Sequence, residues 1–493
     1  MEDLLVQFPS LRRILPAVAA LAVAVFFIRT ASHFAYTPDD AYIYLRTASN
    51  IVQGDGLSFN PGEPSYSVTG PLWALLIAAG TGIGLDPYVA AKGLDLTFAA
   101  IAIMVFQLLV VTVTGDRVLS VVGAVMLTVD AWALRWAGSG LETSLALLLT
   151  IVAFRYVLMG EWLLTAAAAG LLVLLRPENI LLVPWLVVAT YDGDWRVHAR
   201  RWAWPVTIVA AIAGGWWAFA FLTFGDPFPT TFAGKAAGVT NFSDMAAALW
   251  DSIRVAAVTQ GSVVLVMVGL LLWFRGCLRG MQGRLLIVLV GWPVFLTFVY
   301  AMQGVQVVSR YLVPVLPLLT AGALLTISWL RVQGSLSLRR TVSLTATMTL
   351  LTIVVNTTVY ETSISPHLRD FSVGMQQAMK PIAYWIRSHT KPEDEVLAPD
   401  VGMVGYLGRR RVWDPAGLAT PGLRRALDGH SYDEIMTKGL YRSVVNPRYV
   451  IDRSRQKERL ASATMRPILT AEFAALDVSI PGTQYVTRYE AWR

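Results

Sequence analysis

The sequence predicts a polytopic α-helical membrane protein that ends in a soluble α/β domain. Only 15% of the 493 residues are charged, against about 25% in soluble domains, and the mean hydropathy is +0.55. Apolar segments recur up to residue 359, whereas 34 of the 73 Asp, Glu, Lys and Arg residues fall within 361–493. This shift predicts a transmembrane domain over residues 1–360 and a separate domain over residues 361–493.

Twelve apolar segments are candidate transmembrane helices. They cover residues 14–29, 71–85, 93–114, 118–134, 142–158, 162–175, 178–190, 203–223, 254–274, 284–302, 311–330 and 341–359. Several are shorter than the roughly 20 residues that a membrane helix prefers, so length alone does not show which of them cross.

The distribution of Lys and Arg predicts how the chain crosses the membrane. Basic clusters lie at 12–13, 196–201, 275–284 and 331–340, and clusters of this kind favour the cytoplasmic side. We therefore expect the N-terminus in the cytoplasm and the domain over 361–493 on the extracytoplasmic side. The protein is expected to be a multi-pass protein of the plasma (inner) membrane.

Counting crossings from the two ends of the chain gives totals that disagree by one. One apolar segment must therefore not cross the membrane. Pro71–Leu85 is the best candidate, because it is short, begins with proline and contains three glycines. We predict a juxtamembrane or re-entrant helix there, about eleven transmembrane helices, and a first external loop over residues 30–92.

The first external loop carries two adjacent carboxylates, Asp39 and Asp40. From Ala41 to Val52, apolar side chains recur at helical spacing, which predicts an amphipathic helix. Glycines and prolines over 54–64 then predict turns. A polar loop of this length is typically functional or disordered, and its aromatic and apolar content argues against disorder. The loop is the first candidate for a functional site.

The same topology places further charged residues at the outer membrane boundary. They are Glu142, Arg176, Glu178, Asp226, Lys235 and Arg310. Carboxylates and cations that gather on one side of a membrane indicate a site that handles an anionic head group next to lipid.

Helix and strand patterns alternate in the domain over 361–493. Residues 381–390 predict an amphipathic helix, and 401–408 a short glycine-containing helix or turn. Strands are predicted at 396–399, 409–414 and 447–452. This alternation favours a small layered α/β structure.

Composition argues against several other kinds of protein and site. Much of the positive charge comes from Arg in loops between helices, so the net charge of +7 predicts no nucleic-acid partner. The single cysteine, Cys277, excludes an intramolecular disulfide and a cysteine-based metal cluster. No histidine besides His33 lies near the two aspartates in the sequence, which argues against a histidine-based zinc site.

Seven motifs, taken in order, resemble the polyprenyl-phosphate-sugar-dependent glycosyltransferases of the GT-C fold. The motifs are DDAYIYLR, GDGLSFNPGE, SVTGPLW, SGLET, RPEN, GDPFPTTFAGK and RYLVPVLPLL. The resemblance is closest to the mycobacterial terminal arabinofuranosyltransferases, whose extracytoplasmic domain is similar to VGMVGYLGRRRVWDPAGLATP. It implies an enzyme of cell-wall biogenesis that transfers a sugar, with arabinofuranose favoured, from a polyprenyl phosphate to an envelope glycan.

The resemblance assigns the role of general base to Asp39, which would take the proton of the acceptor hydroxyl. Asp40 would orient the acceptor or bind a metal, and neighbouring residues on a helix point in different directions, which separates the two roles. Both carboxylates could instead cap the helix that starts at Ala41. Glu142 matches the second acidic position of the family, where it would contact a sugar hydroxyl or a metal; alternatively, it stabilises a helix N-terminus.

Lys235, Arg310 and Arg176 are candidates for binding the phosphate of the lipid donor, because Arg binds phosphate through two N–H groups and Lys as a point charge. Each could instead extend to the membrane interface, and Arg176 could pair with Glu178. Tyr42, Tyr66 and Trp73 could stack on a sugar, although most aromatic residues near helix ends lie in the interface. No cofactor follows from the sequence, and a divalent metal ion at Asp40 and Glu142 is left open.

Other functions remain open at this stage. The donor could be polyprenyl-phosphate mannose or an aminoarabinose carrier on the same fold. The chain could instead transport or flip a lipid-linked sugar, although transporters favour internal repeats and ionisable residues at the membrane midplane. A non-catalytic envelope scaffold is a third class.

Overall fold

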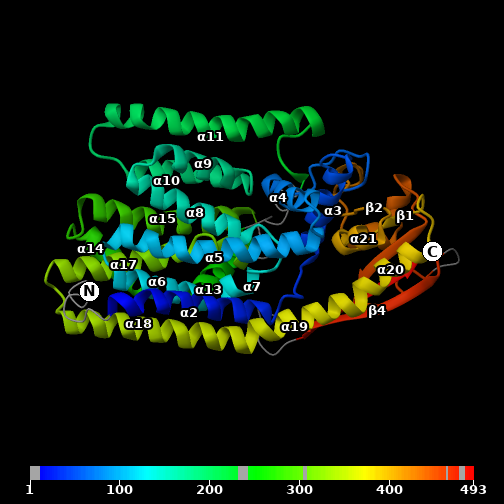
Figure 1. The fold of residues 1–493 in the computed structure, drawn as a ribbon. Helices are drawn as coiled ribbons and strands as arrows, with labels where there is room; N and C mark the ends of the chain where they lie inside the picture. Colours follow the sequence, from blue (N-terminus) through cyan, green and yellow to red (C-terminus); the bar gives the residue numbers. More distant parts are fainter. Residues whose placement is uncertain (1–10, 231–241, 304–307, 462–464, 477–483) are drawn as a thin grey trace.

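A computed structural model describes residues 11–230, 242–303, 308–461, 465–476 and 484–493. Most of the helices lie side by side in a long bundle, and a five-stranded sheet lies beyond one end of it (Figure 1). This arrangement agrees with the predicted helical membrane protein that carries a C-terminal α/β domain.

The predicted apolar segments all form helices. Through residue 224 the structure has α2 (Leu11–Ala31), α3 (Asp39–Gln53), α4 (Pro71–Gly82), α5 (Pro87–Thr114), α6 (Arg117–Val129), α7 (Ala131–Trp136), α8 (Thr143–Met159), α9 (Trp162–Val173), the 3₁₀ helix η1 (Pro177–Leu181), α10 (Leu182–Ala189) and α11 (Trp195–Phe224). After residue 241 it has α13 (Phe242–Thr259), α14 (Val263–Phe274), α15 (Gly280–Gln303), α16 (Val308–Leu312), α17 (Leu316–Val332) and α18 (Leu338–Val359). Each of the twelve predicted segments coincides with one of these helices or with a consecutive pair.

Aspartates begin several of these helices. The side chains of Asp86, Asp116 and Asp130 each accept hydrogen bonds from the first free backbone N–H groups of α5, α6 and α7. A carboxylate at this position satisfies donors that have no partner within the helix. The same sequence signal therefore sets where the chain turns at both ends of the bundle.

Length and composition identify fewer spanning helices than the sequence predicts. Among the described residues, five helices are long and apolar enough to cross a membrane, and a sixth span arises if α13 and α14, bent by 106°, are counted together. Six shorter apolar helices, including α6, α8, α9 and α17, have 10–17 residues. The total of eleven spans therefore stays a prediction.

Helix α4 occupies the segment that we predicted not to cross. It has 12 residues, which gives a length of about 18 Å against a hydrocarbon thickness of about 30 Å. It lies at the end of the bundle nearest the sheet and packs on α3 and α5 (Figure 1). This position supports a juxtamembrane helix.

The predicted basic loops lie far from the sheet. The start of α2 and the connections α10–α11, α14–α15 and α17–α18 all lie at the end of the bundle opposite the sheet (Figure 1). Arg-rich loops at one end and the C-terminal domain at the other support the predicted orientation. Which end faces the cytoplasm stays a prediction.

One long helix joins the bundle to the sheet. From α18 the helix continues through a π-turn, η2 (Tyr360–Ile364), into α19 (Ser365–Gly374), and through a second π-turn, η3 (Met375–Met379), into α20 (Lys380–His389). The whole run has 52 residues. The predicted boundary at 360/361 therefore falls inside a continuous helix, and the division into two domains stays a prediction based on composition.

The C-terminal sheet contains β1 (Glu395–Leu397), β2 (Arg411–Trp413), β3 (Tyr449–Ser454), β4 (Pro467–Leu476) and β5 (Gln484–Trp492) in the order β2-β1-β3-β5-β4. Strand β1 pairs in parallel with β2 and β3, whereas β5 pairs antiparallel with β3 and β4. The three predicted strands are β1, β2 and β3, so that prediction is confirmed. The β4–β5 pair was not predicted.

Helices lie around this sheet. Helix α21 (Val401–Gly408) links β1 to β2, and α22 (Pro421–Ala426), α23 (Tyr432–Thr437) and η4 (Leu440–Ser443) lie between β2 and β3. Helix α21 packs against both α20 and α3. The contact with α3 brings the C-terminal domain onto the first external loop.

Candidate active site at the end of the helical bundle

Asp39 and Asp40 occupy the first turn of α3, and their side chains have different partners. The Asp39 carboxylate accepts hydrogen bonds of 2.8 Å from the backbone N–H groups of Gly402 and Met403. The Asp40 carboxylate accepts one of 2.7 Å from Arg310 Nη1, and 47% of its side chain is exposed. The expected separation of the two carboxylates is therefore confirmed.

The alternative that both aspartates cap the helix starting at Ala41 is wrong. Helix α3 begins at Asp39, its N-cap residue is Pro38, and no side chain caps it. Asp39 instead bonds to the first turn of α21, 363 residues further along the chain at Gly402. The carboxylates still lie at the positive end of the α3 dipole, which favours their charge.

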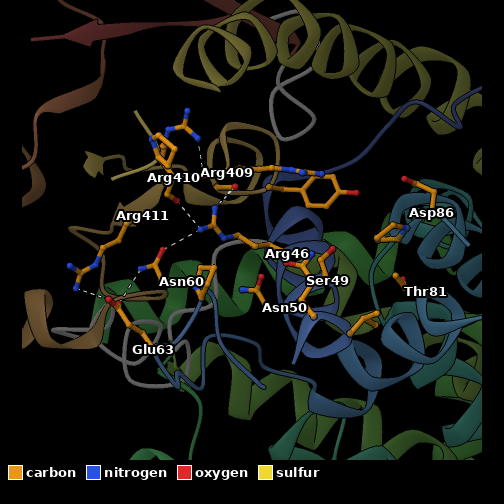
Figure 2. Close-up of a pocket in the computed structure, with 17 residues that line it drawn as sticks. Arg46, Ser49, Asn50, Asn60, Glu63, Thr81, Asp86, Arg409, Arg410 and Arg411 are labelled. Atoms are coloured by element: carbon orange, nitrogen blue, oxygen red, sulfur yellow. Dashed lines mark hydrogen bonds and ion pairs between the residues drawn. The ribbon is translucent and has the colours of Figure 1, made fainter. Parts of the chain in front are cut away.

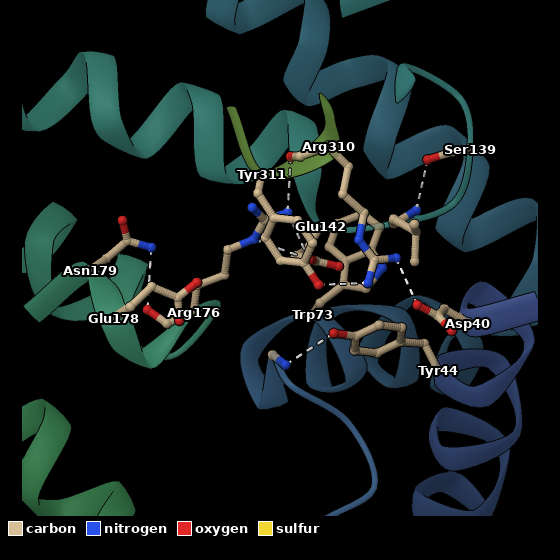
Figure 3. Close-up of polar contacts among 12 residues, drawn as sticks. Asp40, Tyr44, Trp73, Ser139, Glu142, Arg176, Glu178, Asn179, Arg310 and Tyr311 are labelled. Carbon is tan, nitrogen blue, oxygen red and sulfur yellow. Dashed lines mark hydrogen bonds and ion pairs between the residues drawn. The ribbon is translucent and has the colours of Figure 1, made fainter. Parts of the chain in front are cut away.

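A buried ion pair lies on the Asp40 side of α3. Glu142 Oε1 accepts hydrogen bonds from Arg176 Nε at 3.2 Å and Nη2 at 3.1 Å (Figure 3). The Arg176 side chain is 1% exposed and the Glu142 side chain 6%. Among the residues that the structure describes, Nη1 of Arg176 has no hydrogen-bond acceptor. A buried guanidinium N–H without a partner is costly, which suggests that a ligand acceptor completes this site.

Arg310 connects this ion pair to Asp40. Its Nη1 donates to Asp40, its Nη2 donates to the Tyr311 hydroxyl at 2.8 Å, and its carbonyl oxygen accepts from Arg176 Nη2 at 3.3 Å (Figure 3). The structure therefore brings together side chains from the first external loop and from three other predicted external motifs.

Glu178, another of the charged residues predicted at the outer membrane boundary, does not pair with Arg176. Its Oε1 accepts a hydrogen bond of 2.8 Å from the Tyr300 hydroxyl. The expected alternative of a local Arg176–Glu178 pair is therefore not what forms, because Arg176 is directed to Glu142 instead. The partner of Arg176 is thus Glu142, the residue that precedes α8.

Two predicted residues lie elsewhere or outside the described ranges. The Asp226 carboxylate accepts a hydrogen bond of 3.0 Å from the backbone N–H of Phe228, in the turn that follows α11, and it lines a different cavity with Arg424 and Arg453. Lys235 lies outside the described residues, so its phosphate-binding role stays a prediction.

The three aromatic residues expected to contact sugar are buried. Tyr42 is 7% exposed and packs on Tyr406 with ring centroids 5.9 Å apart, and the hydroxyl of Tyr66 accepts a hydrogen bond of 2.7 Å from Trp216. Trp73 is fully buried and donates to the carbonyl oxygen of Gly140 at 3.0 Å. Packing accounts for these rings, so sugar stacking stays a prediction that their burial does not support.

The residues proposed to hold a metal do not fit one. Asp40 and Glu142 are each paired with an arginine, whose positive charge opposes that of a cation. Over the described residues, no group of three or more His, Cys, Asp or Glu side chains is arranged to bind a metal. The donors present in the cluster suit an anionic ligand better.

Two residues that the sequence analysis missed hold the loops of this site in place. Lys92 Nζ, buried in α5, donates to the carbonyl oxygens of Tyr36 at 2.5 Å and Gly138 at 2.6 Å. Asp95, one turn further along α5, accepts from the Gly140 N–H at 3.0 Å. These contacts fix the segments that precede Asp39 and Glu142. A lysine and an aspartate three residues apart in an apolar segment were the available signal.

A third missed residue, Asp400, lies close enough to Asp39 for their charges to interact. It accepts hydrogen bonds from Arg453 Nη1 at 2.8 Å and the Tyr489 hydroxyl at 2.6 Å. Burial raises the pKa of the Asp39 carboxyl above its ordinary value, and the charge of Asp400 raises it further, whereas the two backbone N–H groups oppose the shift. Asp39 is therefore more basic than an exposed aspartate.

The contact between Asp39 and α21 depends on Gly402. A Cβ atom at this position would collide with the main-chain carbonyl oxygen of Asp39. We expect Gly402→Ala to lower the free energy of unfolding by about 1–3 kcal/mol, because the main chain at Asp39 or in α21 must move to make room for the Cβ atom. Thermal unfolding in detergent measures this loss of stability. Gly422→Ala is the matched control, because a Cβ there meets open space, and an equal loss of stability in both variants would contradict the contact.

The fold is that of several solved GT-C glycosyltransferases. ArnT from Cupriavidus metallidurans is similar at a TM-score of 0.59 and 14% identity, with 98% of both chains covered. The Archaeoglobus fulgidus oligosaccharyltransferase AglB, solved with an inhibitory peptide and a dolichol-phosphate, has a TM-score of 0.56 and 11% identity, over 87% of this chain and 69% of its own. These similarities place the chain in the GT-C fold class.

A third similar structure belongs to a much longer protein. The arabinofuranosyltransferase AftD from Mycobacteria has a TM-score of 0.51 and 17% identity, and the match covers 97% of this chain but 41% of AftD. A family model described as a domain of unknown function (DUF8728) matches residues 368–491. No curated protein sequence matches the chain. At 11–17% identity, the three structural similarities show the fold.

Proposed function

We propose that the protein is a membrane glycosyltransferase that moves a sugar from a polyprenyl phosphate to an envelope glycan on the extracytoplasmic side. The observation that carries the proposal is the Arg176 guanidinium, which is buried beside Glu142 and whose Nη1 has no acceptor among the described residues. It lies in one cluster with Arg310 and Asp40. The guanidinium groups of Arg176 and Arg310 lie beside the carboxylates of Glu142 and Asp40. Such a cluster suits the transfer of a sugar from a phosphate.

The reaction that we propose is a displacement at the anomeric carbon of the sugar. The bond between this carbon and the phosphate oxygen breaks, and a bond to the acceptor oxygen forms. The acceptor hydroxyl loses its proton to Asp39, and the polyprenyl phosphate leaves with the electron pair. A positioned base typically contributes about 10²–10⁴-fold to the rate of such a step.

Asp39 suits the base role better than Asp40 does. Its raised pKa makes the carboxylate a stronger base near neutral pH, and two backbone N–H groups fix its direction while each oxygen keeps a free lone pair. Asp40 is paired with Arg310, which stabilises its negative charge. We therefore propose that Asp40 orients the acceptor hydroxyl and holds Arg310 in place.

Arg176 and Arg310 are proposed to bind the donor phosphate. Charge develops on the phosphate as the sugar leaves, and fixed cations in a water-poor site stabilise it strongly. Glu142, held between them, sets the position of Arg176. The transmembrane domain over 1–360 would bind the lipid, and the domain over 361–493 would present the acceptor.

The sugar is a separate part of the proposal. We favour arabinofuranose because of the ordered sequence motifs, with mannose and aminoarabinose as alternatives on the same fold. Membranes that contain the protein can be incubated in parallel with the three radiolabelled polyprenyl-phosphate sugars. Label in glycan from the arabinofuranose donor alone supports the favoured sugar. Label from one of the others replaces it, and label from none contradicts the proposal.

The raised pKa of Asp39 predicts how the rate depends on pH. The base must be ionised, so the rate rises with pH as Asp39 loses its proton, and the raised pKa moves this acidic limb above the ordinary aspartate range. In Asp400→Asn, a neighbouring negative charge is lost and Arg453 is left unpaired, so the pKa of Asp39 falls. We expect the acidic limb to move by roughly one pH unit to lower pH. A pH profile of kcat with no shift, or a shift upward, would contradict this link.

A further inference from the structure

A second polar site lies at the far end of the contact between α3 and α21. A cavity of about 540 Å³ opens there between the first external loop and the C-terminal domain. Figure 2 shows Arg409, Arg410 and Arg411 at one side and Thr81 and Asp86 at the other. This cavity is separate from the Asp40–Arg310 cluster, since none of its lining residues belongs to that cluster.

Two of its arginines build the wall of the cavity. Arg46, 5% exposed, donates to the carbonyl oxygens of Phe59 at 2.6 Å and Arg410 at 2.7 Å. Arg410, 8% exposed, donates to the carbonyl oxygens of Arg387 at 2.9 Å and Thr390 at 2.7 Å. Carbonyl oxygens satisfy these N–H groups but do not neutralise their charge. Burial lowers the pKa of Arg46 only to about 10, so this residue remains positively charged near neutral pH.

Arg409 is the arginine that is available to a ligand. Its side chain is exposed, and within the described part of the chain its guanidinium has no hydrogen bond or ion pair. It also ends α21 in the left-handed conformation, with φ of 53°, where Gly or Asn is the usual residue. A residue held in a disfavoured conformation at a cavity is an indication of function.

The charges of the cavity select an anion. Arg46, Arg409 and Arg410 have no carboxylate partner among the described residues, whereas Arg411 forms ion pairs with Glu63 and Glu395. Asp86 is the carboxylate on the opposite wall, and one of its oxygens already accepts from two backbone N–H groups at the start of α5. The field in the cavity is therefore positive, and a guanidinium with free N–H groups can bind a phosphate or carboxylate through two of them.

Side chains around Arg409 add the chemistry that binds sugars. Tyr406, which is partly exposed, and Gln53, which is exposed in the last turn of α3, both line the cavity. Along α3 the lining runs from Arg46 to Gln53, six to 13 residues after Asp40, so it begins about 9 Å and ends about 20 Å from that residue. Arg409 follows Gly402, which bonds to Asp39, by seven residues. An extended glycan can reach from one site to the other along the α3–α21 contact.

We infer that this cavity binds an anionic group on the acceptor glycan, on a sugar other than the one whose hydroxyl reacts. The inference rests on the proposed function, because it names the substrate end that the second site holds. By holding one end of a long acceptor, the cavity determines which of its hydroxyl groups lies at the reaction centre. Short acceptors, which cannot reach Arg409, gain nothing from it.

Calorimetry on the full-length protein in detergent tests this inference. The probes are an arabinofuranose octasaccharide with a phosphate at its reducing end, the same octasaccharide without phosphate, and inorganic phosphate. The variant Arg409→Asn removes the charge with a residue that tolerates the left-handed conformation, and Arg425→Asn, at an exposed site on α22, is the control for charge loss. Wild type and Arg425→Asn should bind the phosphorylated octasaccharide about tenfold more tightly than the neutral one.

The outcomes separate this inference from the proposed function. Arg409→Asn should abolish the preference for the phosphorylated octasaccharide and leave transfer to a disaccharide acceptor unchanged. Equal binding of the two octasaccharides by wild type, a preference that persists in Arg409→Asn, or equally tight binding of inorganic phosphate would overturn the inference. If the protein transfers no sugar but the Arg409-dependent preference is observed, the proposed function fails and the anion site stands.

Discussion

Replacing Asp39 by Asn is expected to lower kcat for sugar transfer by about 10²–10⁴-fold. The amide keeps the size of the carboxylate and one carbonyl oxygen, so at least one of the bonds from Gly402 and Met403 can persist. What is lost is the group that takes the proton of the acceptor hydroxyl. The binding of acceptor and donor should change little, so KM should change less than kcat.

Matched variants show whether the loss is chemical. Asp40→Asn removes a neighbouring charge and the partner of Arg310 but leaves the base, so its kcat should fall less than that of Asp39→Asn. Asp192→Asn, at an exposed ion pair with Arg201, should behave as wild type. If Asp40→Asn is the more severe variant, the two aspartates have the opposite roles. The pH profile also separates them, because only the loss of Asp39 should remove the acidic limb.

Removing the phosphate-binding arginines is the second change with a large expected effect. Arg176→Met alone leaves Glu142 buried without its partner, which commonly costs about 3–5 kcal/mol of stability. The double variant Arg176→Met with Glu142→Gln removes both charges, so most of this stability should return. Its kcat/KM should nevertheless be lower than that of wild type by about 10²–10³-fold, because the donor phosphate loses a fixed cation.

The comparison between stability and activity decides the role of Arg176. Thermal unfolding in detergent measures the stability, and sugar transfer from the radiolabelled lipid donor measures the activity. Arg201→Met is a matched control, since Arg201 pairs with Asp192 at an exposed site. Full recovery of transfer together with stability in the double variant would mean that the buried pair is structural only, and the phosphate would then bind elsewhere.

Much of the fold could be predicted because the residue pattern within a single segment determines whether that segment forms a helix or a strand. Apolar length located the twelve segments that form helices in the described part of the bundle, and the Lys/Arg distribution led to the external motifs of Asp40, Glu142, Arg176 and Arg310, which meet at one end of it. Helix α3 and strands β1, β2 and β3 likewise follow from local patterns. The short helices were harder, because six of them have 10–17 residues and length does not say whether these cross.

The parts that could not be predicted depend on contacts between distant segments. Nothing near Asp39 in the sequence indicates that its oxygens bond to Gly402 and Met403, more than 360 residues away. Arg176 was open to pairing with Glu178, two residues away, yet the fold brings Glu142 to it across two helices. The β4–β5 pair was missed because neither strand stands out until the other is paired with it.

One measurement tests the central claim most directly. The purified protein is placed in lipid vesicles with a radiolabelled polyprenyl-phosphate sugar and an acceptor glycan, and the label is followed in the lipid and water-soluble fractions for wild type and Asp39→Asn. We expect label in the glycan with wild type and almost none with Asp39→Asn. Label that crosses the bilayer while still attached to the lipid, without glycan product, would indicate transport. Equal transfer by both proteins would contradict the proposed role of Asp39.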